Sequence, residues 1–458
     1  MKVVVCVRQG LDGEINPFDA SAYEAALRIA GAEVILLSMA PASAKDFLLS
    51  LTRLGARRAV LLSDRVFAGA DTLATAYALS LAIRRLSPDL VLCGRQTLVG
   101  DTAQTGPMLA EMLGFSLITN ALRIELSESA VTCTTREDGA QKAALPALIT
   151  VERIHTLRFP GIFSRVGEVE TLTATELGAD TAKCGLSGSP TRVLATFENT
   201  SGKRKCKWIT PDALMGIVAE AREKKPSLPV VDAPKTTLDR VYAVGNEVYE
   251  MASQVSSSVT VIEKTDADTI AEIIKKEQPK AVLWASDAWS KRTAATVAAR
   301  LSLGLCADCT ALESDGERLI MYRPALSGSI IAKIVSNTAP AMATVRTKSA
   351  ADDVVVAIGY GAKDSIDKIR AFAQRIGADL AASRKVVDSD ILPYPLQVGL
   401  TGKTVSPPVY IALGISGAVH HIAGMQNALT VIAVNPDKDA PIFEYADYGI
   451  VAKVEDIL

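Results

Sequence analysis

The residues whose types and spacing best suit ligand chemistry lie near the C-terminus. Two of the chain's three histidines, His420 and His421, follow the apolar run VYIAL (409–413) and the turn Gly-Ile-Ser-Gly (414–417). A similar turn, AIGYGAKD (357–364), follows another apolar run. Glycines let backbone amides approach a phosphate, and a helix N-terminus favours its negative charge. Each turn alone is equally well explained as a tight strand–helix connection without a ligand.

The segment between these two turns adds hydroxyl and ammonium groups. They belong to Thr401, Lys403, Thr404 and Ser406. Together with the turns they predict a phosphate-bearing cofactor, because such side chains supplement backbone amides as phosphate donors. Neither turn matches the GxGxxG fingerprint, so the pattern does not specify which cofactor is bound.

The N-terminal half has its own polar residues at predicted helix starts. Asp71-Thr72 opens one helix, and residues 101–105 open another. Cys6 and Val7 end the first predicted strand, and Cys93-Gly94 ends the strand that precedes residues 101–105. Acidic and hydroxyl residues at helix starts are also ordinary N-caps, which explains each position separately.

The composition is that of a large soluble globular protein, with 49% hydrophobic and 22% charged residues. The formal net charge of -2 and the aromatic content of 5% argue against a nucleic-acid partner or an anionic membrane surface. No stretch approaches the ~20 apolar residues that span a bilayer, and the N-terminus MKVVVCVRQG does not read as a signal peptide. We therefore expect a cytoplasmic protein without membrane insertion.

The seven cysteines are scattered and odd in number, which is typical of reduced thiols. Cys306 and Cys309 form the only CxxC, and neither a second cysteine pair nor a histidine accompanies them. No metal site is predicted.

Short β-branched runs alternate with helical periods, which predicts an α/β fold. In the first half, strands are expected at 2–7, 33–38, 58–63 and 89–94, with helices at 19–30, 43–55 and 71–86. Nearly continuous apolar strands separated by such helices predict a parallel sheet covered on both faces. A third part of the chain repeats the theme, with strands at 353–359, 409–414 and 429–434.

Two parts of the chain share one pattern. PDLVLCG (88–94) leads to TAQTGPMLAEMLGFSLIT (102–119), and PKAVLWA (279–285) leads to TAATVAARLSLGLCAD (293–308). An offset of roughly 190 residues indicates two related α/β domains. We predict domains at 1–181, 192–335 and 336–458, with the small-residue segment 182–191 as a linker.

Three C-terminal stretches resemble the FAD-binding domain of the electron transfer flavoprotein alpha subunit. They are GADLAASRKVVD (377–388), QVGLTGKTVSPPVYIALGISGAVHHIAGM (397–425) and VNPDKDAPIFEYADYGIVA (434–452). The first 180 residues resemble the beta subunit, notably in NPFDASAYEAALRI (16–29) and CGRQTLVGDTAQTGPMLAEMLG (93–114). The chain therefore resembles a beta–alpha fusion. The resemblance implies two adenine-nucleotide-hydrolase-like domains followed by a Rossmann-like FAD-binding domain.

The resemblance implies an FAD site in the third domain. Arg384 would lie against the isoalloxazine ring, Thr401 near the flavin N5, and His421 at the pyrimidine carbonyl. An arginine is permanently charged and an imidazole can donate, so both suit a flavin that gains negative charge on reduction. The implied residues are Ser383, Arg384, Gln397, Val398, Gly399, Thr401, Gly402, Ser416, Gly417, Ala418, His421, Asn435 and Asp437. The alternatives are a surface salt bridge for Arg384 and a structural role for His421.

Two departures from the family pattern weaken polar contact with the flavin. Tyr360 stands where the family usually has an arginine, and Leu400 where it usually has a glutamine.

The resemblance also implies a second nucleotide in the beta-like half. It would be AMP in plain electron carriers and a second FAD in electron-bifurcating members. The implied residues are Cys6, Val7, Asp71, Thr72, Cys93, Gly94, Asp101, Thr102, Ala103, Gln104 and Thr105. The stretch GRQ…GDTAQTGP is somewhat more similar to the bifurcating type, and the choice stays open.

The implied function is electron transfer through FAD between a flavin dehydrogenase, of the acyl-CoA dehydrogenase type, and a further acceptor. The segment 151–167 would dock the dehydrogenase through apolar side chains, or would be packed into the protein. Two alternatives remain: an NADH-oxidising bifurcating flavoprotein with two FAD, and a redox-inactive nucleotide-binding module.

Overall fold

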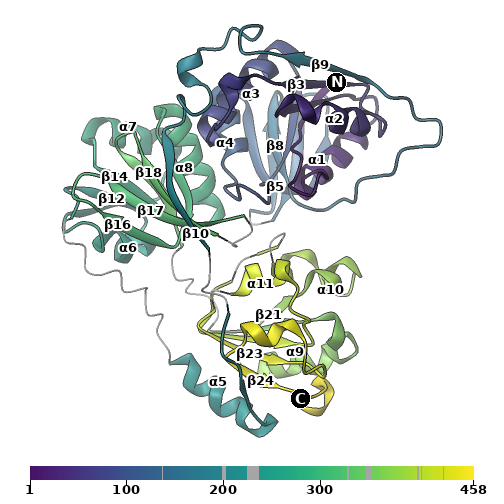
Figure 1. Ribbon diagram of the computed structural model, residues 1–458, viewed down its shortest axis with the longest axis vertical. Coiled ribbons are helices and arrows are strands. Elements are labelled where there is room, and N and C mark those ends of the chain that lie inside the picture. Colours follow the sequence, from purple (N-terminus) through teal and green to yellow (C-terminus); the bar gives the residue numbers. More distant parts are fainter. Residues whose placement is uncertain are drawn as a thin grey trace. The chain divides into compact units, whose positions relative to one another are not determined.

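The computed structural model describes residues 1–136, 138–198, 203–223, 237–326, 330–346, 353–399, 402–403, 405–426 and 428–458. The chain forms two compact units (Figure 1). The larger unit comprises residues 1–197, 232–326 and 331–347. The C-terminal unit comprises residues 198–231, 327–330 and 348–458.

The first half of the larger unit is built on a mainly parallel sheet in the order β7-β6-β5-β8-β4-β1-β2-β3-β9. The strands are β1 (Lys2–Cys6), β2 (Glu33–Met39), β3 (Arg58–Leu62), β4 (Leu90–Gly94), β5 (Ser116–Leu126), β6 (Ala130–Thr135), β7 (Ala140–Ala144), β8 (Ala147–Val151) and β9 (Glu168–Leu172). The helices are α1 (Pro17–Leu27), α2 (Lys45–Thr52), α3 (Thr72–Leu86) and α4 (Thr105–Leu113). The expected strands and helices of this half are present, with slightly different ends.

Both faces of this sheet are covered, as the apolar strands predict. In β1, Val3 and Val5 pack with α1 and α2, whereas Val4 packs with α3 and α4. All three valines are fully buried. Successive residues of a strand point to opposite faces, so a strand covered on both sides must be apolar throughout.

The second half of the larger unit repeats this sheet. Its order is β13-β12-β14-β19-β15, which corresponds to β2-β1-β4-β8-β5 of the first half. The strands are β12 (Val241–Val244), β13 (Val259–Ile262), β14 (Ala281–Ala285), β15 (Leu305–Cys309) and β19 (Ala341–Val345), and the helices are α6 (Tyr249–Ser253), α7 (Ala267–Glu277) and α8 (Ala288–Leu301). A smaller sheet consists of β10 (Thr191–Glu198), β18 (Ile330–Ser336), β17 (Leu319–Ala325) and β16 (Ala311–Ser314).

The two halves share a hydrophobic core. Side chains of α3 and α4 pack in one cluster with those of α7 and α8, and α4 contacts α8 directly. Arg300 of α8 also pairs with Glu111 of α4, with Nε and Oε1 2.7 Å apart. The larger unit is therefore held together by buried apolar surface between its halves.

The C-terminal unit is a single parallel sheet in the order β11-β24-β23-β22-β20-β21. The strands are β11 (Lys207–Trp208), β20 (Val354–Ile358), β21 (Asp379–Ala382), β22 (Val409–Leu413), β23 (Thr430–Val434) and β24 (Tyr448–Ile450). The helices are α5 (Leu214–Arg222), α9 (Ile366–Arg375), α10 (Arg384–Asp388) and α11 (Val419–Met425). With parallel strands covered by helices in both halves of the larger unit and in the C-terminal unit, the predicted α/β fold class is confirmed.

Residues 203–223 join the C-terminal sheet, although sequence analysis grouped them with residues 192–335. β11 pairs with β24, Arg204 forms an ion pair with Asp447, and Leu214 and Val218 of α5 are buried in the core of this unit. Pairing across such a separation leaves no local sequence signal.

The predicted linker 182–191 is packed rather than loose. Leu186 N donates to Ala68 O at 2.9 Å, and the Ser189 hydroxyl donates to Gly185 O at 2.6 Å. Cys184 is almost fully buried. These contacts fix the segment on the first half of the larger unit.

Candidate functional site

The predicted FAD-binding residues gather at one end of the C-terminal sheet. β20 lies between β21 and β22, so the strand order reverses beside it. Ligands of open parallel sheets bind outside the carboxyl ends of the strands at such a reversal. The turns at 359–361 and 414–417 directly follow β20 and β22. The structure thus places both glycine-rich turns at the edge where a ligand is expected.

The two turns also need glycine for their own packing. Gly359 N donates to Leu413 O at 2.7 Å, and a Cβ on Gly359 would lie 2.0 Å from the Gly414 carbonyl oxygen. Gly417 has a φ of 93°, which a residue with a Cβ rarely adopts. These glycines are therefore required in part by the packing and backbone conformation of the turns themselves, apart from any ligand.

His421 lies on α11 and is buried. Its Nε2 is 2.9 Å from the Tyr410 hydroxyl oxygen, and its Nδ1 has no hydrogen-bond partner among the described residues. Burial lowers the pKa of His421 to about 4, although the Val398 carbonyl acts to raise it. The imidazole is therefore neutral at pH 7. An unpaired, buried ring nitrogen fits a bound group that supplies the missing partner.

Ser383 and Arg384 follow β21. Ser383 N donates to Ile358 O at 2.9 Å, which ties the end of β21 to β20. Arg384 is exposed, and its Nε lies 3.0 Å from Asp388 Oδ2 one turn further along α10. Exposed pairs of this kind contribute little, so a ligand can replace the carboxylate.

Two lysine side chains lie against the ring of Tyr360 at the same end of the sheet. The ammonium groups of Lys363 and Lys385 lie 4.9 Å and 4.2 Å from the centre of its ring. Ammonium groups are attracted to the face of an aromatic ring. The replacement of the family's arginine by Tyr360 therefore leaves this end of the sheet with lysine charge.

Residues 397–399 and 402–403 are hydrogen-bonded to one another and to the end of β21. Val398 N donates to Ala382 O at 2.9 Å, Gly399 N donates to Lys403 O at 3.1 Å, and Gly402 N donates to Gly399 O at 3.0 Å. Gln397 is buried. Thr401, together with Leu400 and Thr404, lies outside the described residues.

Asn435 and Asp437 build the turn that follows β23. Asn435 Nδ2 donates to Ile415 O at 2.9 Å, and Asn435 Oδ1 accepts from Asp437 N at 2.9 Å. Ser416 and Ala418 are exposed on the neighbouring turn, where Ser416 O accepts from Ile442 N at 3.1 Å. Asn435 thus connects the turns after β22 and β23.

The predicted second-nucleotide residues gather at another reversal of strand order. β1 lies between β2 and β4, and Cys6 pairs with Cys93 where these strands end. Val7 N donates to Leu37 O at 2.9 Å, which extends the pairing of β1 with β2. This edge of the first sheet corresponds to the edge of the C-terminal sheet at which the predicted FAD-binding residues lie.

Asp19 holds the two strand ends together, and sequence analysis missed it. Its Oδ2 accepts from Arg8 N at 2.9 Å and its Oδ1 accepts from Gly94 N at 3.2 Å. Burial raises the pKa of Asp19 to about 7, against hydrogen bonds that act to lower it. An aspartate in the first turn of a helix is common, so its sequence position gave no signal beyond a favourable charge.

Gln104 gives the clearest indication of a ligand in this half. It is buried, its Oε1 accepts from the Thr72 hydroxyl at 3.0 Å, and its Nε2 has no hydrogen-bond partner within the described part of the chain. Thr72 and Gln104 stand at the N-termini of α3 and α4. An unpaired buried donor between two helix N-termini fits an anionic group such as a phosphate.

Both carboxylate oxygens of Asp71 accept hydrogen bonds from within the protein. Its Oδ1 accepts from Leu73 N and Ala74 N, which caps α3, and its Oδ2 accepts from Thr191 N at 3.0 Å and from the Thr191 hydroxyl at 2.7 Å. The structure therefore gives Asp71 the capping role that sequence analysis left open. A contact with a nucleotide stays a prediction.

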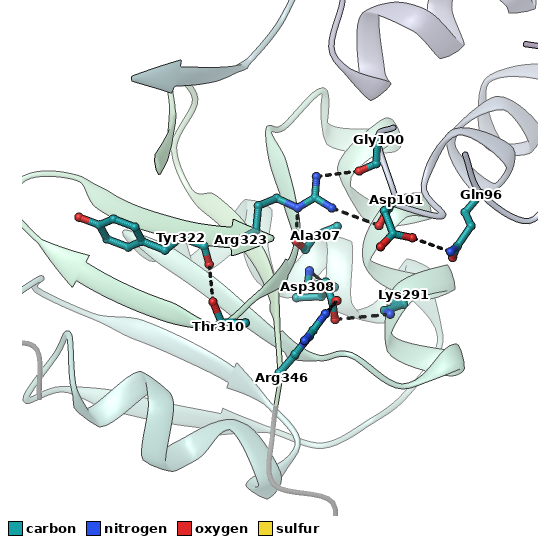
Figure 2. A network of polar contacts seen from close by, with 11 residues as sticks. Gln96, Gly100, Asp101, Lys291, Ala307, Asp308, Thr310, Tyr322, Arg323 and Arg346 are labelled. Carbon is teal, nitrogen blue, oxygen red and sulfur yellow. Dashed lines mark hydrogen bonds and ion pairs between the residues drawn. The ribbon is translucent and has the colours of Figure 1, made fainter. Parts of the chain in front are cut away.

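Residues 101–105 form the half-buried approach to α4. Asp101 and Ala103 have φ values of 51° and 56°, in the left-handed region. Asp101 Oδ1 accepts from Gln96 Nε2 (Figure 2). Thr102 and Thr105 are half-buried on either side of Gln104.

In the second half, charged side chains fill the space at the carboxyl ends of β12 and β14, which correspond to β1 and β4 of the first half. There, Lys264 Nζ lies 2.6 Å from Glu247 Oε1 and 2.9 Å from Asp287 Oδ2, and 5.4 Å from the centre of the Trp289 ring. Glu247 follows β12 and Asp287 follows β14. The protein's own ion pairs thus occupy the position that holds the predicted site in the first half.

Comparison with protein families agrees with this architecture. The electron transfer flavoprotein domain matches residues 3–177 and again residues 220–373. The electron transfer flavoprotein FAD-binding domain matches residues 349–426. This chain belongs to the electron transfer flavoprotein family. The duplicated halves of the larger unit are thus two copies of one family domain, and the C-terminal unit carries the FAD-binding domain.

Relatives of both subunits align with this chain. It is 42% identical over 202 residues to the electron transfer flavoprotein subunit beta of Thermoanaerobacterium thermosaccharolyticum, covering 42% of this chain and 78% of that protein. It is 35% identical over 232 residues to the subunit alpha of the same organism, covering 40% and 70%. The two relatives match different halves, which confirms the beta–alpha fusion. A third relative, subunit LctC of the lactate dehydrogenase (NAD(+),ferredoxin) of Acetobacterium woodii, is 36% identical over 238 residues, covering 42% and 57%.

Within the described residues, no cluster of histidine, cysteine, aspartate and glutamate is suited to hold a metal ion. None of the described helices combines the length and apolarity required to cross a membrane.

Proposed function

We propose that this chain carries electrons through FAD between a flavin dehydrogenase, of the acyl-CoA dehydrogenase type, and a further acceptor. The observation that carries the proposal is the match to the FAD-binding domain, whose sheet reverses its strand order beside β20. Tyr360 and Arg384 lie just after the paired strands β20 and β21, and His421 lies on the helix that follows β22. FAD supplies the electron-accepting chemistry. The protein supplies binding, fixed charge and donors around the cofactor.

We assign the predicted FAD residues the following tasks. Arg384 exchanges its contact with Asp388 for the flavin and stabilises negative charge there. His421 offers its unpaired Nδ1 to the cofactor, while the hydrogen bond between Nε2 and the Tyr410 hydroxyl holds the orientation of the ring. Amides of Ser416, Gly417 and Ala418 hold the phosphates.

The segment 151–167 provides a surface for the dehydrogenase. In the connection between β8 and β9 (Figure 1), Phe159, Ile162 and Phe163 are each more than nine-tenths exposed. Arg158 at its base is fixed by Glu24, with Nη2 and Oε1 2.9 Å apart. Exposed aromatic and aliphatic side chains on an anchored arm suit an apolar pocket on a partner.

The direct test is electron transfer with defined partners. The purified chain, loaded with FAD, is mixed with an acyl-CoA dehydrogenase and its substrate, and flavin bleaching is followed by absorbance. Rapid bleaching that is lost in a Phe159→Ser/Phe163→Ser variant supports the proposal. A chain that cannot be loaded with FAD would favour the redox-inactive alternative.

A second candidate is an NADH-oxidising bifurcating flavoprotein with two FAD, of which the second would occupy the predicted nucleotide site of the first half. Gln104 Nε2 and the N-termini of α3 and α4 fit a phosphate group there, and one relative is named for NAD(+) and ferredoxin. Nucleotides released on denaturation distinguish the two candidates. Two FAD per chain favour bifurcation, whereas one FAD and one AMP favour the simple carrier.

A further inference from the structure

The loop between β4 and α4, residues 95–104, is held by the second half of the larger unit at three successive carbonyls. Val99 O accepts from Leu326 N at 3.3 Å. Gly100 O accepts from Arg323 Nη1 at 2.9 Å, and Asp101 O accepts from Arg323 Nη2 at 3.1 Å. Arg323 lies near the end of β17, so the end of one strand supplies all three donors.

The Arg323 guanidinium is fixed before it meets this loop. Its Nε donates to Ala307 O of β15 at 2.7 Å, and the residue is only 6% exposed. Figure 2 shows the Arg323 side chain between Ala307, which belongs to the second half like Arg323, and Gly100 and Asp101 of the first half. A planar guanidinium held at Nε presents its two terminal nitrogens as a rigid fork.

Among the described residues, Arg323 forms no hydrogen bond with a carboxylate, although the Asp101 carboxylate lies near enough to interact with it electrostatically. Asp308 is neutralised by other cations, because Arg346 Nη2 lies 2.6 Å from its Oδ2 and Lys291 Nζ lies 3.6 Å from its Oδ1. The three hydrogen bonds of Arg323 all go to backbone carbonyls. Its contacts are therefore those of a side chain that fixes backbone shape.

The loop needs such support, because it contains two left-handed residues. Asp101 and Ala103 both have positive φ, which disfavours residues with a Cβ and persists only where the surroundings impose it. The start of the loop is held from the first half, since Asn16 Nδ2 donates to Gln96 O at 3.0 Å. The end, next to Gln104, is held by Arg323.

We propose that Arg323 is a positioning residue for the second nucleotide site: it fixes residues 99–101 so that Gln104 and the first turn of α4 face an anionic nucleotide. The proposal rests on the proposed nucleotide site in the first half and adds that the second half sets its shape. The affinity of that site is then a property of both halves of the chain.

The test uses the full chain stripped of nucleotide, with AMP as the first probe and FAD as the second. Affinity is measured by calorimetry, and the exposure of residues 95–104 by hydrogen exchange in the absence of nucleotide. Arg323→Met is expected to weaken binding at this site at least tenfold and to speed exchange of the loop. In Arg323→Lys the single ammonium group can replace only some of the three hydrogen bonds of the guanidinium. This variant is therefore expected to lose less affinity than Arg323→Met.

Arg318→Met is the matched control, because Arg318 is exposed and pairs with Asp315 at the other end of β17. It removes the same charge and is expected to change neither measurement. If Arg323→Met and Arg323→Lys bind both probes and exchange like the unaltered chain, the proposal is wrong. If Arg323→Met does not fold, Arg323→Lys decides by the same two measurements. An unaltered chain that binds neither probe at a second site contradicts the nucleotide proposal, while the exchange of the loop still tests the role of Arg323.

Discussion

At the scale of single residues, Arg384 and His421 differ in how much the protein itself already uses them. Arg384 is exposed and held by one weak pair with Asp388, so its charge can turn to a ligand at little cost. His421 is buried and bonded to Tyr410, so it is part of the core as well as of the site. Substitutions at these positions should therefore have different signatures.

Replacing Arg384 with Ala should lower the midpoint potential of the bound flavin, because a positive charge beside the reduced flavin is lost. A loss of roughly 1 kcal/mol corresponds to about 40 mV for a one-electron couple. Redox titration of the FAD-loaded chain measures this shift. Arg375→Ala is the control, since Arg375 lies in the last turn of α9, away from the carboxyl end of β20. If the two variants have equal flavin midpoint potentials, Arg384 has no role at the flavin and forms only a surface ion pair.

Replacing His421 with Phe should alter the flavin absorbance spectrum and lower the stability of the apoprotein. The Tyr410 hydroxyl would lose its partner in the core, which costs roughly 1–3 kcal/mol. The folded pKa of about 4 lies below the unfolded value, so the neutral imidazole stabilises the fold above about pH 6.5. That contribution declines as the pH falls towards 4. Thermal melts of the original chain and the variant between pH 4 and 7 test this, and an unchanged flavin spectrum would leave His421 with a structural role only.

At the scale of elements, the exposed arm 153–166 is anchored on α1 by the ion pair of Arg158 with Glu24 and by hydrogen bonds from Ile154 N and His155 N to the Ser21 hydroxyl. Burial acts to raise the pKa of Glu24, but hydrogen bonds from Arg158 and Arg28 outweigh it and lower the pKa to about 2. The charged form of Glu24 therefore stabilises the fold above about pH 4.5, and this contribution is lost as the pH falls from there towards 2.

Glu24→Gln should loosen the arm and cost roughly 1–3 kcal/mol of stability, since Arg158 keeps only neutral acceptors. Limited proteolysis at Arg158 and Arg165 should become faster, and coupling to the dehydrogenase weaker. Glu170→Gln is the control, because it breaks an exposed pair with Arg58 that should be worth at most about 1 kcal/mol. Equal proteolysis of both variants would show that Glu24 does not anchor the arm.

At the scale of the whole molecule, the fusion joins two domains that already share a core. Side chains of α3, α4, α7 and α8 form one buried cluster, so each half alone would expose a large apolar surface. The covalent connection through 182–191 adds a packed segment to this interface.

Separately produced chains 1–187 and 188–458 should therefore associate in solution. Mixing them should give a one-to-one complex by light scattering, with an affinity of micromolar or better, on the order of that of other large apolar interfaces. Two stable monomers that do not interact would contradict a shared core that holds the halves together.

The sequence by itself determined the α/β class and the duplication, and the resemblance of its C-terminal stretches to a known family indicated the flavin domain. The class and the duplication follow from local signals: apolar strands such as KVVVC and helices of regular period. The residues of segment 377–425 are close together along the chain, so a shared site for them could be proposed without knowing the fold, and that site stays a prediction.

Only the tertiary structure decided which distant residues meet. Asp19 bridges the ends of β1 and β4, Arg323 reaches the loop before α4, and residues 203–223 complete the C-terminal sheet. Each of these looks ordinary in sequence, as a helix-start aspartate, a strand arginine or a connecting segment. Their roles arise from hydrogen bonds between segments far apart in the chain, and such pairing leaves no periodicity in the local sequence.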